Sequence, residues 1–265
     1  VVVINTCGFI DSAKSEAIDF ILQMGQLKEQ GIIGREIDMC GDMPMRRVYY
    51  ALLEALYAHN PIRKSVCGTQ DSIAQITPAL LYTCYKTFYK PSNMVLVLCG
   101  NVDPEAVLAL ADKYIPDGKN ANTERYFEAE PIEIVKNRSS IFMQVARPIF
   151  AIGVKDVAPE VGTQKAVRRG LILRLVSDWI FGTSSAFYER LYNEGLINSH
   201  FSAGYESYRT CAFFLLSGET DDPEMIYSRI LQELDSVCTT PPAEEDFLRV
   251  KKALYAEYIR DFDST

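Results

Sequence analysis

Two acidic side chains in the segment "EQGIIGREIDM" are spaced for chemistry on one face of a helix. Glu29 and Glu36 lie seven positions apart, which is two helical turns with an angular drift of only about 20°. One such carboxylate could ligate a metal while the other accepts a hydrogen bond from a ligand or from metal-bound water. A solvated acidic face is the commoner origin of this spacing. The spacing alone therefore favours an acidic surface over a metal site.

The thiols and imidazoles form no metal-binding pattern in the sequence. The seven cysteines are scattered without a Cys-x-x-Cys pair, and the only histidines are His59 and His200. A zinc ribbon or a disulfide framework needs closer or paired cysteines, so the pattern favours mostly reduced, buried thiols in a cytoplasmic protein. An isolated histidine rarely coordinates a metal alone, so we interpret both histidines as structural.

Composition excludes several classes of protein. The 265-residue chain is 48% hydrophobic and 23% charged, which is typical of a globular protein with one or two domains. Its net charge of -8 argues against a nucleic-acid partner, which requires a basic surface. The longest apolar runs, "MVLVLC" and "CAFFLL", are too short for a membrane helix, and the first residues lack the basic region of a signal peptide.

Helical and strand-like segments alternate along the chain. Period-2 and period-3.6 patterns with capping residues predict α+β layers with antiparallel sheet. A polar stretch over 116–131 is the best domain boundary. The predicted helices cover about 11 to beyond 36, 45–58, 78–88, 104–114, 163–181, 185–194, 223–237 and 242–260, and the predicted strands cover 1–7, 94–100, a pair around 140–154, and 199–217.

The acidic segment belongs to a longer resemblance. "EQGIIGREIDM", "NPIRKSVCGTQDSIAQITPALLYTCYKTFYKPSNMVLVLCGNVDPEAV" and "GTSSAFYERLYNEGLI" follow one another as in the insulinase (pitrilysin) zinc peptidases. The chain resembles their bacterial, processing-peptidase-like branch over about residues 29–265. The resemblance implies two domains of antiparallel sheet layered with helices. By this resemblance we expect a first, zinc-site domain over 29–124 that lacks part of the family's domain, and a second domain over 125–265 that is truncated at its C-terminus.

The resemblance assigns roles to both acids. Zinc in this family is held by a His-x-x-Glu-His helix and by a glutamate from a later helix, and the Glu of the motif acts as general base. Glu36 matches the third zinc ligand, and Glu29 matches the acidic residue that supports the site without binding the metal. Neither His59 nor His200 lies in a His-x-x-Glu-His context. Zinc is thus expected for the family, but we expect this chain not to bind it tightly and not to hydrolyse peptides.

A second departure concerns substrate binding. Many active members carry an Arg and a Tyr seven apart around a Gly-Leu pair, which bind substrate and stabilise the oxyanion. Alignment on Gly195 and Leu196 places Leu191 and Asn198 at those positions. In two-subunit members one subunit carries the zinc motif and the other carries the Arg/Tyr pair. The resemblance therefore implies a dimer with a paralogous peptidase subunit.

The first 28 residues resemble a different family. "VVVINTCGFIDSAK" is similar to the amino-terminal domain of the radical-SAM methylthiotransferases that modify a ribosomal protein. Cys7 matches one of three ligands of their auxiliary iron-sulfur cluster. The other two ligands and the Cys-x-x-x-Cys-x-x-Cys motif have no counterpart in the sequence. Because a cluster needs several thiolates, Cys7 alone would not hold one.

Three hypotheses follow for a chain that combines two families. The first is a zinc metalloendopeptidase of the insulinase type without its complete active centre. The second is a non-catalytic subunit or interaction module of the same fold, which would bind no zinc. The third is a methylthiotransferase fragment, which would require a radical-SAM barrel that residues 29–265 do not resemble.

Overall fold

The computed structural model describes residues 30–115, 125–157, 162–240 and 243–263. The chain divides into two compact units. Unit 1 comprises Val1–Cys40 and Val66–Tyr126, and unit 2 comprises Gly41–Ser65 and Phe127–Thr265. The predicted division at 28/29 and 124/125 rests on family resemblance and stays a prediction.

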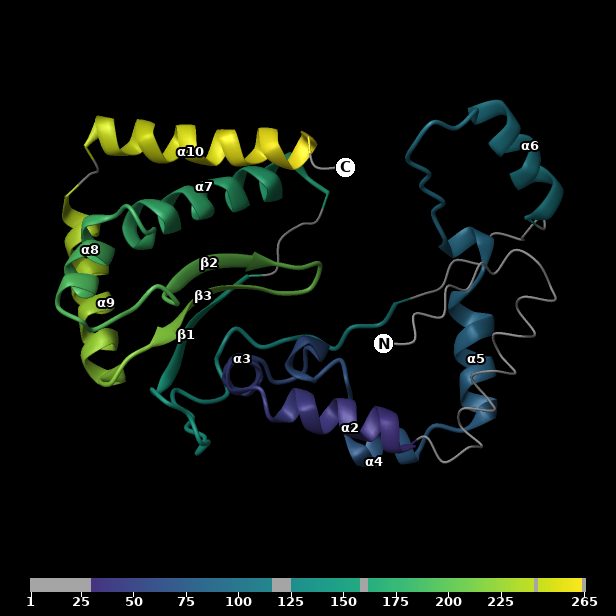
Figure 1. The fold of residues 1–265 in the computed structure, drawn as a ribbon, viewed down its shortest axis with the longest axis horizontal. Helices are drawn as coiled ribbons and strands as arrows, with labels where there is room; N and C mark the ends of the chain where they lie inside the picture. Colours follow the sequence, from purple (N-terminus) through teal and green to yellow (C-terminus); the bar gives the residue numbers. More distant parts are fainter. Residues whose placement is uncertain (1–29, 116–124, 158–161, 241–242, 264–265) are drawn as a thin grey trace. The chain divides into compact units, whose positions relative to one another are not determined.

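Unit 2 is built on a three-stranded antiparallel sheet (Figure 1). Its strands are β1 (Ile149–Asp156), β2 (Ser202–Ser207) and β3 (Ala212–Glu219), in the order β1-β3-β2. β3 pairs with β1 along its whole length, from Ile149 opposite Glu219 to Asp156 opposite Ala212. The central strand is therefore hydrogen-bonded on both sides.

One face of this sheet is covered by helices. α7 (Gln164–Phe181) packs against β2, and α10 (Glu244–Asp263) packs against α7. α8 (Ala186–Asn193) and α9 (Pro223–Thr239) also belong to this part of the chain. Strands β1 and β3 and helices α7, α8 and α9 contribute to one apolar core, made of Phe150, Ile180, Phe181, Phe187, Leu191, Ile197, Phe201, Leu216, Ile226 and Ile230.

The other face of the sheet receives α3 (Pro44–Leu56), which packs against β1. Successive side chains of a strand point to opposite faces, so Phe150 lies in the first core while Gly153 faces α3. A Cβ on Gly153 would lie 2.8 Å from Leu52 Cδ1, so glycine allows the close approach. The second core, which we call the α3 cluster, consists of Leu53, Leu56, Tyr57, Cys211 and Phe213.

Local sequence signals set the ends of most helices. Thr77 accepts a hydrogen bond from the N–H of Leu80 at the start of α5 (Pro78–Phe88), and Asp103 accepts one from Glu105 at the start of α6 (Pro104–Tyr114). Both helices have proline at their first position, where no intrahelical N–H is needed. The remaining elements are α2 (Gln30–Gly41), α4 (Gln70–Ala74) and two short 3-10 turns, η1 (Pro61–Arg63) and η2 (Pro91–Asn93).

The predicted fold class is confirmed, and so are the helices near 45–58, 78–88, 104–114, 163–181, 185–194, 223–237 and 242–260. The part of the first predicted helix before residue 30, and the predicted strand 1–7, lie outside the described residues.

Two strand predictions were wrong. Residues 94–100 form no strand, and Val95 and Val97 are 88% and 80% exposed, because no described segment pairs with them. The predicted strand pair around 140–154 is a single strand, since β1 begins only at Ile149. None of the described helices combines the length and the apolar character that a membrane crossing requires.

Candidate functional site

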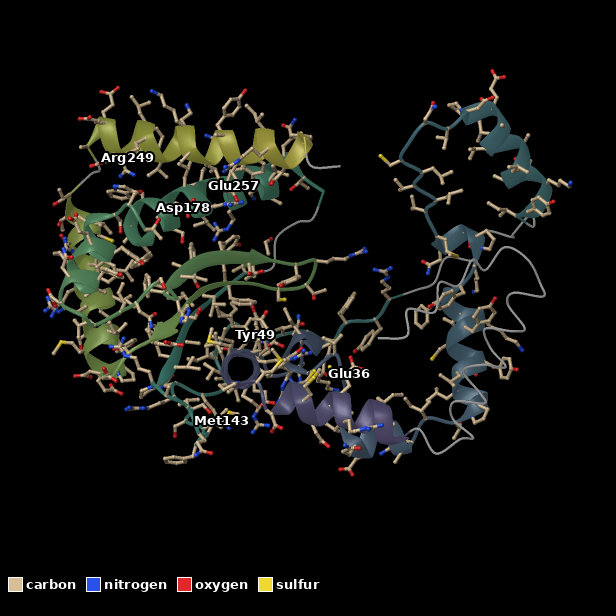
Figure 2. The ribbon with its side chains drawn as sticks, viewed as in Figure 1. Glu36, Tyr49, Met143, Asp178, Arg249 and Glu257 are labelled. Carbon is tan, nitrogen blue, oxygen red and sulfur yellow. The ribbon has the colours of Figure 1, made fainter. Side chains whose placement is uncertain are left out.

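Glu36 lies on α2 with its side chain exposed (Figure 2). This helix ends at Gly41, so Glu36 sits in its second half. Glu29, the predicted supporting acid, lies outside the described residues, as does Cys7. The zinc-ligand role of Glu36 stays a prediction.

Gly34, two positions before Glu36, has a packing role. The side-chain amide of Gln70, on α4, donates to the carbonyl of Gly34 at 3.1 Å and to Asp38 Oδ1 at 3.3 Å. A Cβ on Gly34 would lie 3.0 Å from the Gln70 amide atoms, so a larger side chain would push that amide away. Gln70 thus links the turn of α2 that contains Glu36, from Gly34 to Asp38, to α4.

The two histidines lie apart from this helix in the sequence, and each contacts a carboxylate. His59 Nδ1 lies 3.1 Å from Glu128 Oε1, and His200 Nδ1 lies 3.1 Å from Glu219 Oε1. Hydrogen bonds from Asn198 and His200 lower the pKa of Glu219. The His59 and His200 side chains are 43% and 67% exposed, and each pairs with one carboxylate rather than with a metal-ligand set.

The described residues do not fit a zinc centre. They include no group of three or more His, Cys, Asp or Glu side chains that could hold a metal ion. A zinc peptidase needs three protein ligands and a general base beside the bound water. Glu36 provides at most one of these ligands.

The positions of the family's Arg/Tyr pair carry no substrate-binding groups. Leu191, on α8, is 2% exposed and belongs to the core of unit 2. Asn198 donates through Nδ2 to Glu219 Oε2 at 2.7 Å. Neither side chain supplies the positive charge or the phenol that oxyanion stabilisation would use.

The cysteines differ from the expectation of mostly buried thiols. Cys40 and Cys211 are buried, whereas Cys84, Cys99 and Cys238 are exposed and Cys67 is half-buried. Burial raises the pKa of the Cys211 thiol, so this thiol is poorly reactive. The apolar runs around Cys84 and Cys99 predicted burial, but their elements have no described partner that covers them.

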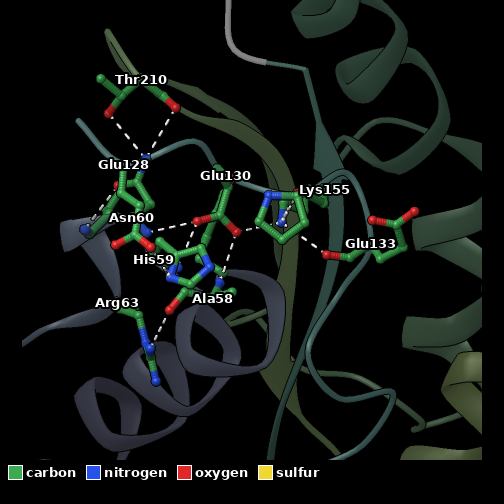
Figure 3. A network of polar contacts seen from close by, with 12 residues as sticks. Ala58, His59, Asn60, Arg63, Glu128, Glu130, Glu133, Lys155 and Thr210 are labelled. Atoms are coloured by element: carbon green, nitrogen blue, oxygen red, sulfur yellow. Dashed lines mark hydrogen bonds and ion pairs between the residues drawn. The ribbon is translucent and has the colours of Figure 1, made fainter.

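A buried polar network of unit 2 was missed by sequence reasoning (Figure 3). The Glu130 carboxylate accepts hydrogen bonds from the backbone N–H groups of Ala58, His59 and Asn60, at 2.7 to 2.8 Å. It also pairs with Lys155 Nζ at 2.8 Å, and the two side chains are only 13% and 7% exposed. This pair joins the end of α3 to β1.

The network is fully satisfied. Lys155 Nζ also donates to the carbonyls of Pro131 and Glu133. Burial alone would raise the pKa of Glu130, but hydrogen bonds from Lys155 and three backbone N–H groups outweigh burial and lower that pKa to about 2. Asn60 and Glu130 lie 70 positions apart in the chain, so no local sequence pattern predicts their contact. The geometry indicates a structural clamp.

Comparisons with known proteins agree with the insulinase-type resemblance. Residues 75–254 match the family model described as "Peptidase M16 inactive domain". The chain is 34% identical over 232 residues to the "Uncharacterized zinc protease YmfH" of Bacillus subtilis, covering 86% of this chain and 54% of that protein. It also matches the crystal structure of an M16-like peptidase from Alicyclobacillus acidocaldarius, with a TM-score of 0.82 and 33% identity, over 89% of this chain and 56% of that one.

The methylthiotransferase resemblance is also found, over a shorter stretch. The chain is 34% identical over 97 residues to the ribosomal protein uS12 methylthiotransferase RimO of Natranaerobius thermophilus, which is 36% of this chain and 20% of that protein. The chain is 64% identical over 31 residues to the ribosomal protein uS12 methylthiotransferase RimO of Desulfitobacterium hafniense, which is 12% of this chain and 7% of that protein. By contrast, the chain spans about half the length of the two peptidase-like relatives. The M16 model covers more than half of the chain. This chain belongs to the M16 peptidase family.

Proposed function

We propose that this chain acts in peptide hydrolysis as part of a zinc metalloendopeptidase of the M16, processing-peptidase-like type, and that it does not cleave peptides by itself. The observation that carries the proposal is the set of side chains that could bind zinc. The described residues hold Glu36 at an exposed helix position but include no cluster that could bind a metal. The sequence holds only two histidines, so a His-x-x-Glu-His motif would have to come from outside it.

In this proposal Glu36 supplies one carboxylate to a zinc site completed by other residues. Two features support this role. Glu36 lies on a helix fixed to α4 through Gln70, and relatives that the chain matches bear the name zinc protease. A helix held on both sides of a ligand keeps that ligand in place, which metal sites require.

The substrate-binding pair would come from a second subunit. Because Leu191 is buried and Asn198 is bonded to Glu219, a paralogous peptidase subunit would supply the Arg and the Tyr. We place this assembly in the cytoplasm, because the seven cysteines lack the paired spacing of an exported disulfide framework.

A non-catalytic subunit of the same fold is the second candidate. It is favoured by the match to the family's inactive domain and by the buried Leu191 at a position that would otherwise bind substrate. The two candidates differ in zinc binding. Only the first predicts that zinc binds once the missing histidines are present.

The test measures zinc content and peptide cleavage by the purified chain, alone and co-expressed with a fragment of an M16 relative that carries His-x-x-Glu-His. Alone, the chain should hold no stoichiometric zinc and should not cleave quenched fluorescent peptides. The co-expressed complex should bind about one zinc per chain, and Glu36→Gln should abolish that binding.

Glu54→Gln is the matched control, because Glu54 is an exposed acid on another helix, α3. It should leave zinc binding unchanged. Zinc-dependent cleavage by the isolated chain, lost in Glu36→Gln, would overturn the proposal. A complex that forms without binding zinc would favour the non-catalytic subunit.

A further inference from the structure

Two cysteines of unit 1 are already in contact. The Sγ atoms of Cys40 and Cys67 lie 3.3 Å apart, although the residues are 27 positions apart in the chain. A disulfide has an S–S distance of about 2.05 Å, so bond formation requires an approach of only about 1.3 Å. Cys40 is buried in the last turn of α2, and Cys67 is half-buried in the turn before α4.

Other contacts hold the two segments together in the reduced state. Gln70 joins α4 to α2 through Gly34 and Asp38. The turn after Cys67 is shaped by Gly68, whose φ of 72° favours glycine. It continues into Thr69, which forms a capping box with Ser72. The two thiols therefore face each other on preorganised segments.

We propose that Cys40 and Cys67 form a reversible disulfide when the chain meets a low-molecular-weight disulfide such as oxidised glutathione. In the first step the more exposed Cys67 thiolate attacks one glutathione sulfur, and one glutathione thiolate leaves. In the second step the Cys40 thiolate attacks Cys67 Sγ and displaces the second glutathione thiolate. The two protein thiols lose two electrons, glutathione disulfide gains them, and the two thiol protons end on the two released glutathiones.

The bond would act on the helix that carries Glu36. Cys40 follows Glu36 by four positions, so the two side chains are neighbours on one side of α2. A link to Cys67 would fasten the last turn of this helix covalently to the segment before α4. The consequence for a zinc ligand rests on the proposed function, whereas formation of the disulfide does not. Cytoplasmic disulfides are typically transient and redox-sensing, which fits a reversible link.

The test is peptide mapping of the reduced chain after equilibration in glutathione buffers of increasing oxidation and alkylation of remaining thiols. We expect a peptide pair linked through Cys40 and Cys67, with the loss of two hydrogens from the mass of the chain. Dithiothreitol should restore both thiols. The assay needs no zinc and no peptidase activity, so its outcome is separate from that of the proposed function.

Two variants test the order of attack. In Cys40→Ser, Cys67 should accumulate as a mixed disulfide with glutathione, because the resolving thiol is absent. In Cys67→Ser, the buried Cys40 should remain largely unmodified. Cys84→Ser removes an exposed thiol of α5 and is the matched control, which should form the link as the unchanged chain does.

The unchanged chain alone can overturn the proposal, so the result does not depend on how well a variant folds. Glutathione adducts on Cys67 and Cys84 to the same extent, with no linked peptide pair at any buffer ratio, would show that the contact does not lead to a bond. A link between either cysteine and a different thiol would overturn it as well.

Discussion

The two compact units differ in what stabilises their helices. In unit 2, the helices α3, α7, α8 and α9 each bury side chains in a core that includes a hydrogen-bonded sheet. In the described part of unit 1, α4, α5 and α6 bury none, and Cys40 is the one buried apolar side chain. Capping residues therefore mark where these helices begin in the sequence, while most of the stability of a helix comes from packing its apolar face against a core.

The largest expected effect tests the clamp of unit 2. Glu130→Ala should lower the free energy of unfolding by about 3–5 kcal/mol, because it leaves Lys155 buried without a counter-charge and three backbone N–H groups without their acceptor. Urea denaturation followed by circular dichroism measures the change.

The matched control is Arg138→Ala, which removes an ion pair with Glu224 whose side chains are 74% and 64% exposed. Its effect should stay below about 1 kcal/mol. Equal losses in the two variants would contradict the structural role of burial at Glu130.

The Glu130 carboxylate also makes the free energy of unfolding depend on pH. Since the pKa of Glu130 is about 2 in the folded chain and 4.5 ordinarily, its stabilisation is present above pH 4.5 and is lost as the pH falls towards 2. Glu130→Gln should remove this part of the acid denaturation profile. A variant whose profile runs parallel to that of the unchanged chain over this range would refute the assignment.

The next effect compares buried and exposed leucines in the two units. Leu53→Ala, at a fully buried position of the α3 cluster, should cost about 2–4 kcal/mol through lost contacts and a cavity. Leu108→Ala, on α6 and 63% exposed, should change the free energy of unfolding by less than about 0.5 kcal/mol. Thermal denaturation of both variants ranks them, and a reversed order would show that unit 1 has a core at α6.

A smaller effect tests the contact of α3 with β1. Gly153→Ala should cost about 1–2 kcal/mol, because the new methyl group would meet Leu52 and Leu56 at 2.8 to 2.9 Å. Gly204→Ala lies in the same sheet, where the added methyl meets no atom within 4 Å. Chemical denaturation should therefore find this second variant unchanged or slightly stabilised.

The smallest effect concerns the apolar run of unit 1. Val97→Lys should leave the free energy of unfolding within about 0.5 kcal/mol of the unchanged chain, because Val97 is 80% exposed. A large loss for Val97→Lys would mean that this run is covered in solution.

How far the sequence predicts the fold depends on whether the signal is local. Thr77 before Pro78 and Asp103 before Pro104 mark helix starts within a few residues, and both predictions were right. The run 94–99 has the composition of a strand, but a strand exists only through hydrogen bonds to a neighbour. Composition therefore identified a segment able to pair without identifying a partner.

The candidate site likewise combines residues that the local sequence predicts with contacts between residues far apart in the chain. The family resemblance identified Glu36 from the local sequence. The Gln70 amide packs against Gly34, two positions before Glu36, and this contact explains why a residue without a side chain occupies that position. The contact of Cys40 with Cys67 had no sequence signal, because the two thiols lie 27 positions apart in the chain. The clamp around Glu130 was missed for the same reason, since its partners lie 25 to 72 positions away.

The assignment of Gly41–Ser65 to unit 2 restricts how the chain can be cut. A fragment that starts at Phe127 would lack α3 and would leave Phe213 and Leu215 of β3 uncovered on one side of the sheet. Exposed apolar strands of this kind promote aggregation. Soluble expression of unit 2 therefore requires residues 41–65 to be supplied, either as a separate peptide or joined through a linker, and a single proteolytic cut near residue 126 would not release two independent halves.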